Sequence, residues 1–321
     1  MRALITGGKG FVGHWLAAHL RSSGDEVVVV DVETDVTDEG AVEAALAAAA
    51  PDAIYHLAAR SHVGDSWRDP LEVLRVNVLG TAAVLAAARR VRDAATVLVV
   101  SSSEVYGAVA PDVLPVTEDT PLRPASPYAA SKAAAEDVAL QAWLGYGQRV
   151  VVVRPFNHVG PGQPHAFAVP ALARRVAEAR RTGSPHLVVG TVTTRRDFTD
   201  VRDVVRAYRL LVLHGEPGEV YNVCSGADVA IADVASRLMA LAGVELELVT
   251  DPALVRPVDL PALRGDPGRL AAVTGWAPAL SLDDTLAAVL AEQDAALGAP
   301  SGAGPSGADG SGADQDPGAT V

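Results

Sequence analysis

The stretch Thr6-Gly7-Gly8-Lys9-Gly10-Phe11-Val12-Gly13 lies between a short apolar run and an Ala/Leu-rich segment near the start of the chain. Its glycines have the G-x-x-G-x-x-G spacing of a turn that joins a strand to a helix. In such a turn Gly7 permits the tight bend, Gly10 lets the main chain approach a pyrophosphate, and Gly13 lets the helix pack on the strand. The helix start then offers unpaired N–H groups and a positive dipole end to phosphates. The stretch therefore predicts a dinucleotide-binding turn in an α/β fold.

Downstream of this turn, apolar runs of strand length alternate with Ala/Leu-rich stretches of helix length. Strands are predicted at 3–5, 27–30, 53–56, 97–101 and 150–153, and helices at 11–23, 39–49, 70–92 and 127–145. This alternation predicts a Rossmann-type, doubly wound parallel sheet with helices on both faces. After Pro155 the order is less regular, with helices predicted at 168–182, 201–214, 229–242 and 283–296 and a strand at 186–189.

These elements suggest two interleaved domains and a tail. We predict a dinucleotide-binding Rossmann domain at 1–160, to which 195–225 returns. We predict a smaller α/β substrate-binding domain at 161–194 and 226–297. From 298 to 321 the chain consists mainly of Gly, Ala, Ser, Pro and Asp. Such a composition does not bury enough apolar surface to offset the entropy of ordering, so this tail is predicted to be disordered.

Composition excludes several classes of protein. The 321 residues are 49% hydrophobic and carry a net charge of −13, which disfavours nucleic acid as a partner. No apolar run approaches the ~20 residues of a membrane span. Cys224 is the one cysteine, and the eight histidines lack metal-ligand spacing, so neither a disulfide nor a metal site is predicted. Because the first strand follows Met1 directly, no signal peptide is expected and the predicted location is the cytoplasm.

The most informative segment for chemistry is Ser126-Pro127-Tyr128-Ala129-Ala130-Ser131-Lys132. Ser126 can cap a helix whose first residue is Pro127. Tyr128 and Lys132 are four residues apart and share one helix face. The ammonium group and the helix N-terminus are both expected to lower the pKa of the Tyr128 phenol towards a useful range for acid–base catalysis. An ordinary solvated helix face is the alternative for such a pair taken alone.

A hydroxyl cluster upstream strengthens this interpretation. The strand predicted at 97–101 runs into Ser101-Ser102-Ser103-Glu104-Val105-Tyr106-Gly107. Ligands bind at the carboxyl edge of open parallel sheets, so a serine there can bond the carbonyl oxygen that Tyr128 protonates. Serines at a strand end otherwise usually begin a loop.

Acidic residues follow the second predicted strand. Asp31 stands where a carboxylate accepts hydrogen bonds from the adenosine ribose and repels a 2′-phosphate, which favours NAD(H) over NADP(H). A solvated loop carboxylate is the alternative, because Glu33 and Asp35 lie close by. Asp38 is placed to be the N-cap of the next helix. The segment from Asp31 to Asp35 is short and leaves little room for a further strand.

With these residues in place, positions 1 to 297 resemble the extended short-chain dehydrogenase/reductases. The resemblance is carried by the glycine-rich turn, His56-Leu57-Ala58-Ala59, Asn77, Ser102, Tyr106-Gly107, Tyr128 with Lys132, and Arg154-Pro155. Counting back from Tyr106-Gly107, it implies that Ser102 carries the catalytic hydroxyl. It also implies that NAD(P)H is bound by Gly7, Gly10, Phe11, Val12, Gly13, Asp31, Asp35, Val36, Leu57, Ala58, Ala59, Asn77, Tyr128, Lys132 and Pro155.

Within that family, the chain is similar to the GDP-6-deoxy-4-keto-D-mannose reductases. The similar segments are 156–163, 196–203, 221–226 and Arg256-Pro257-Val258-Asp259. This likeness implies that Asn157, Arg196 and Arg256 hold the diphosphate-sugar and that Asp259 lies near the nucleotide ribose. Arginine has fork-shaped donors that suit phosphate. Thr191 stands where the guanine-linked relatives are expected to have Asn, so the base is left open.

The resemblance implies reduction of the C4 keto group of a nucleotide-linked 4-keto-6-deoxyhexose, most simply GDP-4-dehydro-6-deoxy-D-mannose to GDP-D-rhamnose or its C4 epimer. It also implies a homodimer formed by the helices at 70–92 and 127–145. A 4,6-dehydratase, with Glu104 as an added base, and a 4-epimerase are alternatives that use the same Ser102, Tyr128 and Lys132. A cofactor-binding regulatory protein is an alternative of another class. Stoichiometric consumption of NADH distinguishes the reductase from all three.

Overall fold

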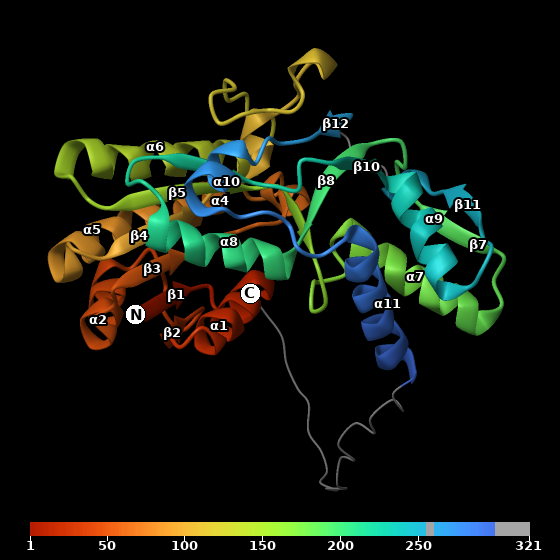
Figure 1. Cartoon of the computed structure of the whole chain (residues 1–321), viewed down its shortest axis with the longest axis horizontal. Helices are drawn as coiled ribbons and strands as arrows, with labels where there is room; N and C mark the ends of the chain where they lie inside the picture. Colours follow the sequence, from red (N-terminus) through yellow and green to blue (C-terminus); the bar gives the residue numbers. More distant parts are fainter. Residues whose placement is uncertain (255–259, 299–321) are drawn as a thin grey trace, which may run out of the picture.

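The computed structural model describes residues 1–254 and 260–298 (Figure 1). Six parallel strands form the main sheet in the order β2-β1-β3-β4-β5-β9. Their bounds are β1 Arg2–Thr6, β2 Glu26–Val30, β3 Ala53–His56, β4 Thr96–Val100, β5 Val150–Pro155 and β9 Val220–Val223. Because the chain moves from β1 out to β2 and then back past β1 to β3, the strand order reverses there. Open α/β sheets bind ligands at the carboxyl edge of such a switch point. The predicted Rossmann-type fold is confirmed.

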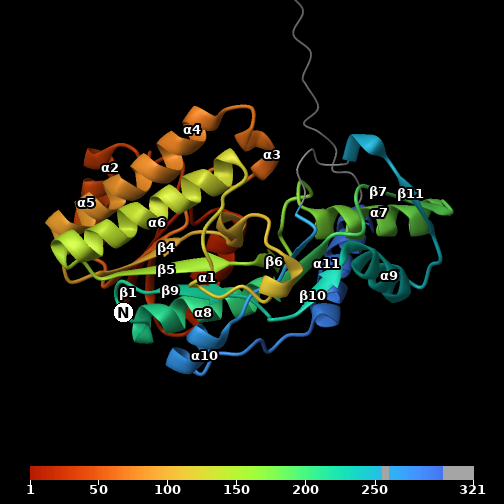
Figure 2. The ribbon, with the colours of Figure 1, turned by 90° about the horizontal axis from the view of Figure 1, so that it is seen from above.

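Helices cover both faces of this sheet (Figure 2). One face packs against α1 (Phe11–Ser22), α8 (Val201–His214) and α10 (Gly268–Thr274). The other packs against α2 (Glu39–Ala49), α5 (Gly80–Arg92) and α6 (Pro127–Tyr146). Val97, Val99 and their neighbours alternate between two buried faces, so strands such as β4 are continuous apolar runs, as expected of a parallel sheet covered on both sides.

The short link after β2 shapes the edge of the sheet. Between β2 and α2 the chain forms turns only, and β2 is therefore the edge strand. Asp38 is the N-cap of α2, and its carboxylate accepts a hydrogen bond from Ala41 N at 3.1 Å. This is the capping role that the sequence left open for Asp38. Val32, in the same link, is 91% exposed.

The stretch predicted as one helix at 70–92 is helical throughout but irregular. It consists of α4 (Pro70–Leu74), a π-helical turn at Arg75–Leu79 and α5. By length and composition it is the one helix in the described ranges apolar enough to cross a membrane, and 44% of its apolar window is buried against the rest of the molecule. It packs on α2 and α6, as a core helix of a globular protein does.

A second group of elements lies beyond the carboxyl edge of the sheet (Figures 1 and 2). Its strands are β6 (Asn157–Val159), β7 (His186–Val189), β8 (Arg195–Asp200), β10 (Asp228–Ala230), β11 (Glu247–Thr250) and β12 (Ala262–Leu263). β8 pairs with β6, β10 and β12, and β7 pairs with β11. The helices α7 (Ala168–Thr182), α9 (Ile231–Ala242) and α11 (Leu282–Gly298) enclose a separate apolar cluster with them. We call this group the substrate lobe and the main sheet with its helices the cofactor lobe.

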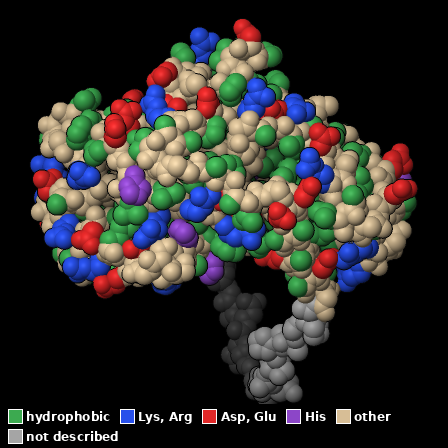
Figure 3. All heavy atoms as spheres, in the orientation of Figure 1, with side chains coloured by type: hydrophobic (Ala, Val, Ile, Leu, Met, Phe, Trp, Pro, Cys, Tyr) green, Lys and Arg blue, Asp and Glu red, His purple; other side chains and the backbone are tan. Residues whose placement is uncertain are grey.

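Within the segment predicted to return to the first domain, α8 and β9 join the cofactor lobe, whereas β8 belongs to the substrate lobe. The remaining short elements are α3 (Val63–Ser66) and 3-10 turns at Ser103–Tyr106, Pro111–Val113 and Pro252–Leu254. Gly298, assigned to the tail from sequence, is the last residue of α11; the rest of the predicted tail, 299–321, lies outside the described residues. Figure 3 shows acidic and basic side chains interspersed over the face that it presents, rather than gathered by sign.

Candidate active site

The glycine-rich turn joins β1 to α1 in a conformation that excludes side chains. Gly7 has φ of +68°, and a Cβ atom there would lie 2.7 Å from Ala58 N. A Cβ on Gly13 would lie 2.5 Å from the Gly7 carbonyl oxygen. Gly10 is the N-cap of α1, and no hydrogen bond from a side chain caps this helix. The N–H groups of its first turn, which begins at Phe11, are thus left for an anion, and the turn fits a pyrophosphate.

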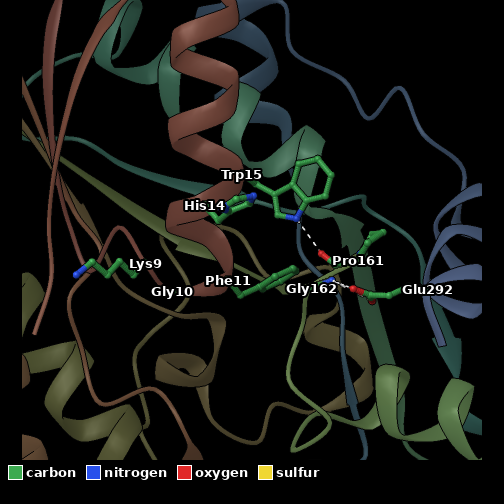
Figure 4. Close-up of a pocket in the computed structure, with 8 residues that line it drawn as sticks. All are labelled: Lys9, Gly10, Phe11, His14, Trp15, Pro161, Gly162 and Glu292. Carbon is green, nitrogen blue, oxygen red and sulfur yellow. Dashed lines mark hydrogen bonds between the residues drawn. The ribbon is translucent and has the colours of Figure 1, made fainter. Parts of the chain in front are cut away.

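A cavity of about 360 Å³ lies beside this turn, where the two lobes meet (Figure 4). It is lined by Lys9, Gly10, Phe11, His14, Trp15, Pro161, Gly162 and Glu292. Trp15 Nε1 donates to the Pro161 carbonyl oxygen at 2.9 Å, and Gly162 N donates to Glu292 Oε1 at 2.8 Å. These bonds fix the loop after β6 between α1 and α11.

The carboxylates after β2 are engaged with the main chain. Asp31 Oδ2 accepts from Lys9 N at 2.7 Å, and Oδ1 accepts from Val32 N at 2.9 Å. Asp31 thus ties the end of β2 to the glycine-rich turn. Lys9 Nζ pairs with Glu33 at 2.9 Å on the surface. Asp35 accepts from Thr37 N at 2.9 Å, and this hydrogen bond lowers the pKa of Asp35.

The end of β3 borders the same turn. His56 is buried, with Nδ1 2.8 Å from Thr6 Oγ1 and Nε2 3.1 Å from Thr81 Oγ1. Burial, and to a lesser extent the charge of Lys132, lowers the pKa of His56 to about 3, so the imidazole is neutral at physiological pH. Ala58 N donates to Thr6 Oγ1 at 3.2 Å. The predicted cofactor residues Leu57, Ala58 and Ala59 therefore follow directly at the carboxyl edge, next to Gly7.

Three other predicted cofactor residues lie further from the turn. Asn77 is buried in the π-helical turn; its Oδ1 accepts from Arg60 N at 2.8 Å and its Nδ2 donates to Ser131 Oγ at 2.8 Å. These bonds connect the loop after β3 to α6. Most hydrogen-bonding groups of the Asn77 side chain are therefore bonded to other residues of the protein. Val36 is buried in the core beside α2 and α5. Pro155 ends β5 at the carboxyl edge, paired in register with Val223 of β9.

Tyr128 lies in the first turn of α6. Ser126 caps that helix by accepting from Ala129 N at 3.1 Å, and Pro127 is its first residue, as predicted. Tyr128 is 8% exposed and hydrogen-bonds to Ser102 at the end of β4. Burial raises the pKa of Tyr128 to about 12; the Ser102 hydrogen bond opposes this and the charge of Glu104 adds to it. The structure thus brings Ser102, Tyr128 and Glu104 together.

The prediction that Lys132 lowers the pKa of Tyr128 is wrong for this structure. Lys132 is buried on the same helix face, but its Nζ donates to the Val100 carbonyl oxygen at 2.7 Å. Burial lowers the pKa of Lys132 to about 8, and Glu136 acts in the opposite direction. Desolvation of the phenol outweighs any attraction to the ammonium group, because it disfavours the charged phenolate. The arrangement therefore holds a protonated tyrosine, which can donate a proton but is a poor base.

The sequence analysis did not single out Glu136, which joins the motif residues Arg154 and Tyr106 in a polar cluster behind Lys132. Glu136 is one turn further along α6, and its carboxylate binds Arg154 at 2.6 Å and accepts a hydrogen bond from the Ser101 hydroxyl. Arg154 also donates to Tyr106 OH at 3.0 Å. A signal was present, because Glu136 continues the four-residue spacing of Tyr128 and Lys132 in an Ala-rich helix.

Two of the four predicted substrate residues can be placed. Asn157 is exposed on β6, in register with Phe198 of β8. Arg196 is buried two residues before Phe198, on the same face of β8. Its Nη1 donates to the Leu260 carbonyl oxygen at 2.7 Å. Arg256 and Asp259 lie outside the described residues.

Acidic residues that follow Arg196 connect segments that are distant in sequence. Asp197 is fully buried and accepts from Ser225 N at 2.8 Å and from Gly226 N at 3.0 Å. Asp203 Oδ2 accepts from Ala279 N and Leu280 N, each at 2.9 Å. The carboxylates of Asp197 and Asp203 thus fix the main chain of the segments that they contact.

Comparisons with known proteins agree with this geometry. A family model described as GDP-mannose 4,6 dehydratase matches residues 30–289. The GDP-6-deoxy-D-mannose reductase of Pseudomonas aeruginosa is 40% identical over 294 residues, which cover 91% of this chain and 96% of that protein. The structure of RMD from Pseudomonas aeruginosa complexed with NADPH has a TM-score of 0.86 and 38% identity, covering 92% of this chain and 100% of that one.

A relative with a different activity has the same fold. The UDP-glucose 4-epimerase of Thermus thermophilus, in complex with NAD, has a TM-score of 0.82 and 31% identity, covering 91% of this chain and 99% of that chain. Both solved relatives bind a nicotinamide dinucleotide, and the glycine-rich turn here fits one. The chain belongs to the GDP-mannose 4,6-dehydratase family of extended short-chain dehydrogenase/reductases.

Proposed function

We propose that the protein is an NAD(P)H-dependent oxidoreductase that reduces the C4 keto group of a nucleotide-linked 4-keto-6-deoxyhexose. The substrate that the likeness favours is GDP-4-dehydro-6-deoxy-D-mannose, and the product is GDP-D-rhamnose or its C4 epimer. The observation that carries the proposal is the state of Tyr128. It is buried, bonded to Ser102 and protonated at physiological pH, which is the state that a reductase needs to supply a proton to a new alcohol.

The residues at the carboxyl edge of the sheet have separate roles in the proposed reaction. Tyr128 donates its phenolic proton to the C4 oxygen as that oxygen becomes an alkoxide, and Ser102 donates a hydrogen bond to the same oxygen. When bound, the reduced nicotinamide supplies the hydride that C4 receives, and it leaves oxidised. Lys132 holds the nicotinamide ribose with its buried ammonium group. Solvent returns a proton to Tyr128 before the next turnover.

We infer that Arg196 and Asn157 contact the diphosphate of the substrate. Arg196 is buried on β8, two residues before Phe198, which is in register with Asn157 on β6. A guanidinium group forms paired hydrogen bonds with phosphate. In the same proposal, Arg256 is a further ligand of the diphosphate, and Asp259 is a ligand of the nucleotide ribose. The division into a cofactor domain at 1–160 and a substrate domain at 161–194 and 226–297 belongs to the same proposal.

Incubation of purified protein with NADH, NADPH and a panel of 4-keto-6-deoxy sugar nucleotides tests the proposal. The expected result is oxidation of one reduced cofactor per sugar reduced, with preference among the bases identifying the nucleotide. An epimerase converts its sugar without net consumption of cofactor, and a regulatory protein binds without turnover. Either result would refute the reductase.

A 4,6-dehydratase is the second candidate, because the family model bears that name and Glu104 lies near Tyr128. A dehydratase needs a base to remove a proton beside the new ketone, and Glu104 is the carboxylate that would serve. Mass spectrometry of GDP-mannose incubated with protein and NAD⁺ separates the two activities. We expect no change of mass; loss of a water mass at a catalytic rate would assign dehydration instead.

NADH is proposed to serve at least as well as NADPH. In this proposal Asp31 lies near the adenosine ribose, where its carboxylate would repel a 2′-phosphate. Lys9, a cation of the same turn, is paired with Glu33. Steady-state kinetics with both cofactors measure the preference. In Glu33→Gln, where Lys9 is released from its partner, the ratio of kcat/KM should move towards NADPH by about tenfold. A strong NADPH preference in the unaltered protein would contradict this part of the proposal.

We further propose a homodimer formed by the helices around α5 and α6, located in the cytoplasm. Leu71 is 76% exposed on α4 and Leu144 is 81% exposed on α6. Large apolar side chains exposed on neighbouring helices mark an association surface. Light scattering at micromolar concentration should give twice the mass of the chain, and Leu144→Glu should give the monomer. Cell fractionation checks the location.

A further inference from the structure

Glu136 is a buried carboxylate that the proposed chemistry does not use. It is 1% exposed and lies on α6, one turn after Lys132 and two turns after Tyr128. Arg154 Nε donates to Oε1 at 3.0 Å, and Arg154 Nη2 donates to Oε2 at 2.6 Å. The Ser101 hydroxyl donates to the same carboxylate. The Glu136 carboxylate is therefore paired with Arg154 and fixed in place.

Arg154 is itself immobilised at the end of β5. Its Nη1 donates to Tyr106 OH and to the Glu118 carbonyl oxygen, each at 3.0 Å. Buried ion pairs contribute little net stability, because desolvation offsets the attraction between the charges. Since two apolar residues would fill this volume as well, the Glu136–Arg154 pair calls for a role other than stability.

The ends of β4 and α6 are joined at three successive positions. The Val100 carbonyl oxygen accepts from Lys132, the Ser101 hydroxyl donates to Glu136, and Ser102 bonds to Tyr128. Along an extended chain, neighbouring side chains point to opposite sides, so Ser101 can be held from below while Ser102 faces the cleft. The bond between Ser101 and Glu136 thus fixes the orientation of Ser102.

We propose that Glu136 is a positioning residue of the active site, which holds Ser102 towards Tyr128 and places a fixed carboxylate one helical turn from Lys132. The proposal rests on the proposed function for the roles of Ser102, Tyr128 and Lys132. It adds that the buried Glu136–Arg154 pair controls the orientation of Ser102 and the electrostatic environment of Lys132.

The charged and titratable groups around Lys132 come from several elements. Tyr128 and Glu136 lie on its own helix, His56 lies on β3, and Arg154 lies on β5 beyond Glu136. His56 is neutral and Tyr128 is protonated at physiological pH. Glu136 is therefore the negative charge among these groups, and it opposes the desolvation that lowers the pKa of Lys132.

The chain offers a direct measurement, because its sequence contains just two lysines, Lys9 and Lys132. Protein labelled with ¹³C at lysine Cε gives two signals, which Lys9→Arg assigns. In Glu136→Gln the titration midpoint of Lys132 should fall by about one pH unit, while that of Lys9 stays fixed. The matched control is Glu178→Gln, which removes a carboxylate from an exposed Glu–Arg pair on α7 and should change neither midpoint. An unchanged Lys132 midpoint in Glu136→Gln would overturn the proposal.

Two further variants separate charge from position. Ser101→Ala removes the hydroxyl and leaves the Glu136 charge, so the Lys132 midpoint should hold while kcat falls about tenfold. An unchanged kcat would refute the positioning of Ser102. If Glu136→Gln fails to fold, Glu136→Gln with Arg154→Gln removes both buried charges and should lower the Lys132 midpoint by less. No lysine titration needs a sugar substrate, so failure of the proposed function and failure of this inference give different results.

Discussion

The two sides of the cleft use their buried polar groups in opposite ways. On the cofactor side, Tyr128 bonds to Ser102 and Lys132 bonds to one main-chain oxygen, and both have pKa values displaced by burial. On the other side, the carboxylates of Asp197 on β8 and of Asp203 near the start of α8, the helix that follows β8 into the cofactor lobe, accept hydrogen bonds from main-chain N–H groups of segments distant in sequence. Tyr128 and Lys132 keep hydrogen-bonding capacity for a reacting molecule. The hydrogen bonds of Asp197 and Asp203 instead hold parts of the fold together.

This difference implies a separation of effects. Replacing a group with spare capacity should lower the rate and leave stability unchanged. Replacing a fully bonded group should lower stability and leave the chemistry of the surviving folded protein intact. The predictions below try to break that separation, beginning with the largest effect.

Tyr128→Phe is expected to lower kcat by about 10²–10⁴-fold. The change removes the hydroxyl that donates the proton and keeps the buried ring. The melting temperature and the affinity for NAD(P)H should remain those of the unaltered protein. Kinetics with a 4-keto sugar nucleotide and a cofactor-fluorescence titration measure both. A variant that keeps more than about a tenth of the rate would remove Tyr128 from its role.

Asp203→Ala should show the reverse behaviour. It leaves two main-chain N–H groups, of Ala279 and Leu280, without their acceptor. The free energy of unfolding should fall by about 2 kcal/mol, since both N–H groups are partly buried and an unsatisfied buried group costs about 1–3 kcal/mol. Urea denaturation measures the loss, and kcat at low temperature should stay within about twofold. Asp119→Ala, at a side chain that is 83% exposed, is the control and should change stability by under about 0.5 kcal/mol.

The rate of keto reduction should fall as the pH rises through about 8. Below that pH Lys132 is protonated, and above it the ammonium group is lost because burial lowers its pKa to about 8. Tyr128 contributes no break in this range, since its pKa is raised to about 12 and the phenol keeps its proton. A plot of log kcat/KM against pH should therefore slope downwards by about one per pH unit. Lys9→Met should keep the same profile, and a flat profile up to pH 10 would contradict the assignment.

Glu104→Gln is expected to have the smallest effect. In a reductase this carboxylate takes no proton from the substrate, so the rate should change by less than about threefold. The pKa of Tyr128 should fall slightly, because the charge of Glu104 helps to raise it. A loss above about a hundredfold would instead identify Glu104 as a base and favour the dehydratase.

Strand positions were predicted better in the cofactor lobe than in the substrate lobe, and the difference has a physical reason. The strands β1, β3 and β5 are local apolar runs, and their positions were predicted to within two residues. In the substrate lobe, β7 was predicted with its exact bounds. The strands that were missed are β9 of the cofactor lobe and β6, β8, β10, β11 and β12 of the substrate lobe. β8 begins Arg195-Arg196-Asp197 and β12 has two residues, so neither has an apolar pattern of its own. They are strands because they pair across more than sixty positions of the chain, and no local window contains that information.

The site shows the same limit. Gly7, Tyr128 and Lys132 could be identified because their spacing is local and follows from strand, turn and helix geometry. Ser102 was chosen among three adjacent serines through the family resemblance. Asp31 was also found, but its bond to Lys9 N was not, since that contact depends on how β2 lies beside β1.

The sequence by itself determined the alternation of strands and helices up to Pro155, the glycine-rich turn without side chains and the tyrosine that we propose as proton donor. Only the tertiary structure decided in which direction the pKa of that residue is shifted. The pKa of Tyr128 depends on how completely α6, β4 and the neighbouring chain exclude water from the phenol, and on where Lys132 finds its partner. It likewise decided that Glu136 would meet Arg154 and Ser101. Burial and charge pairing are sums over residues far apart in the chain, so they exist only once the chain has folded.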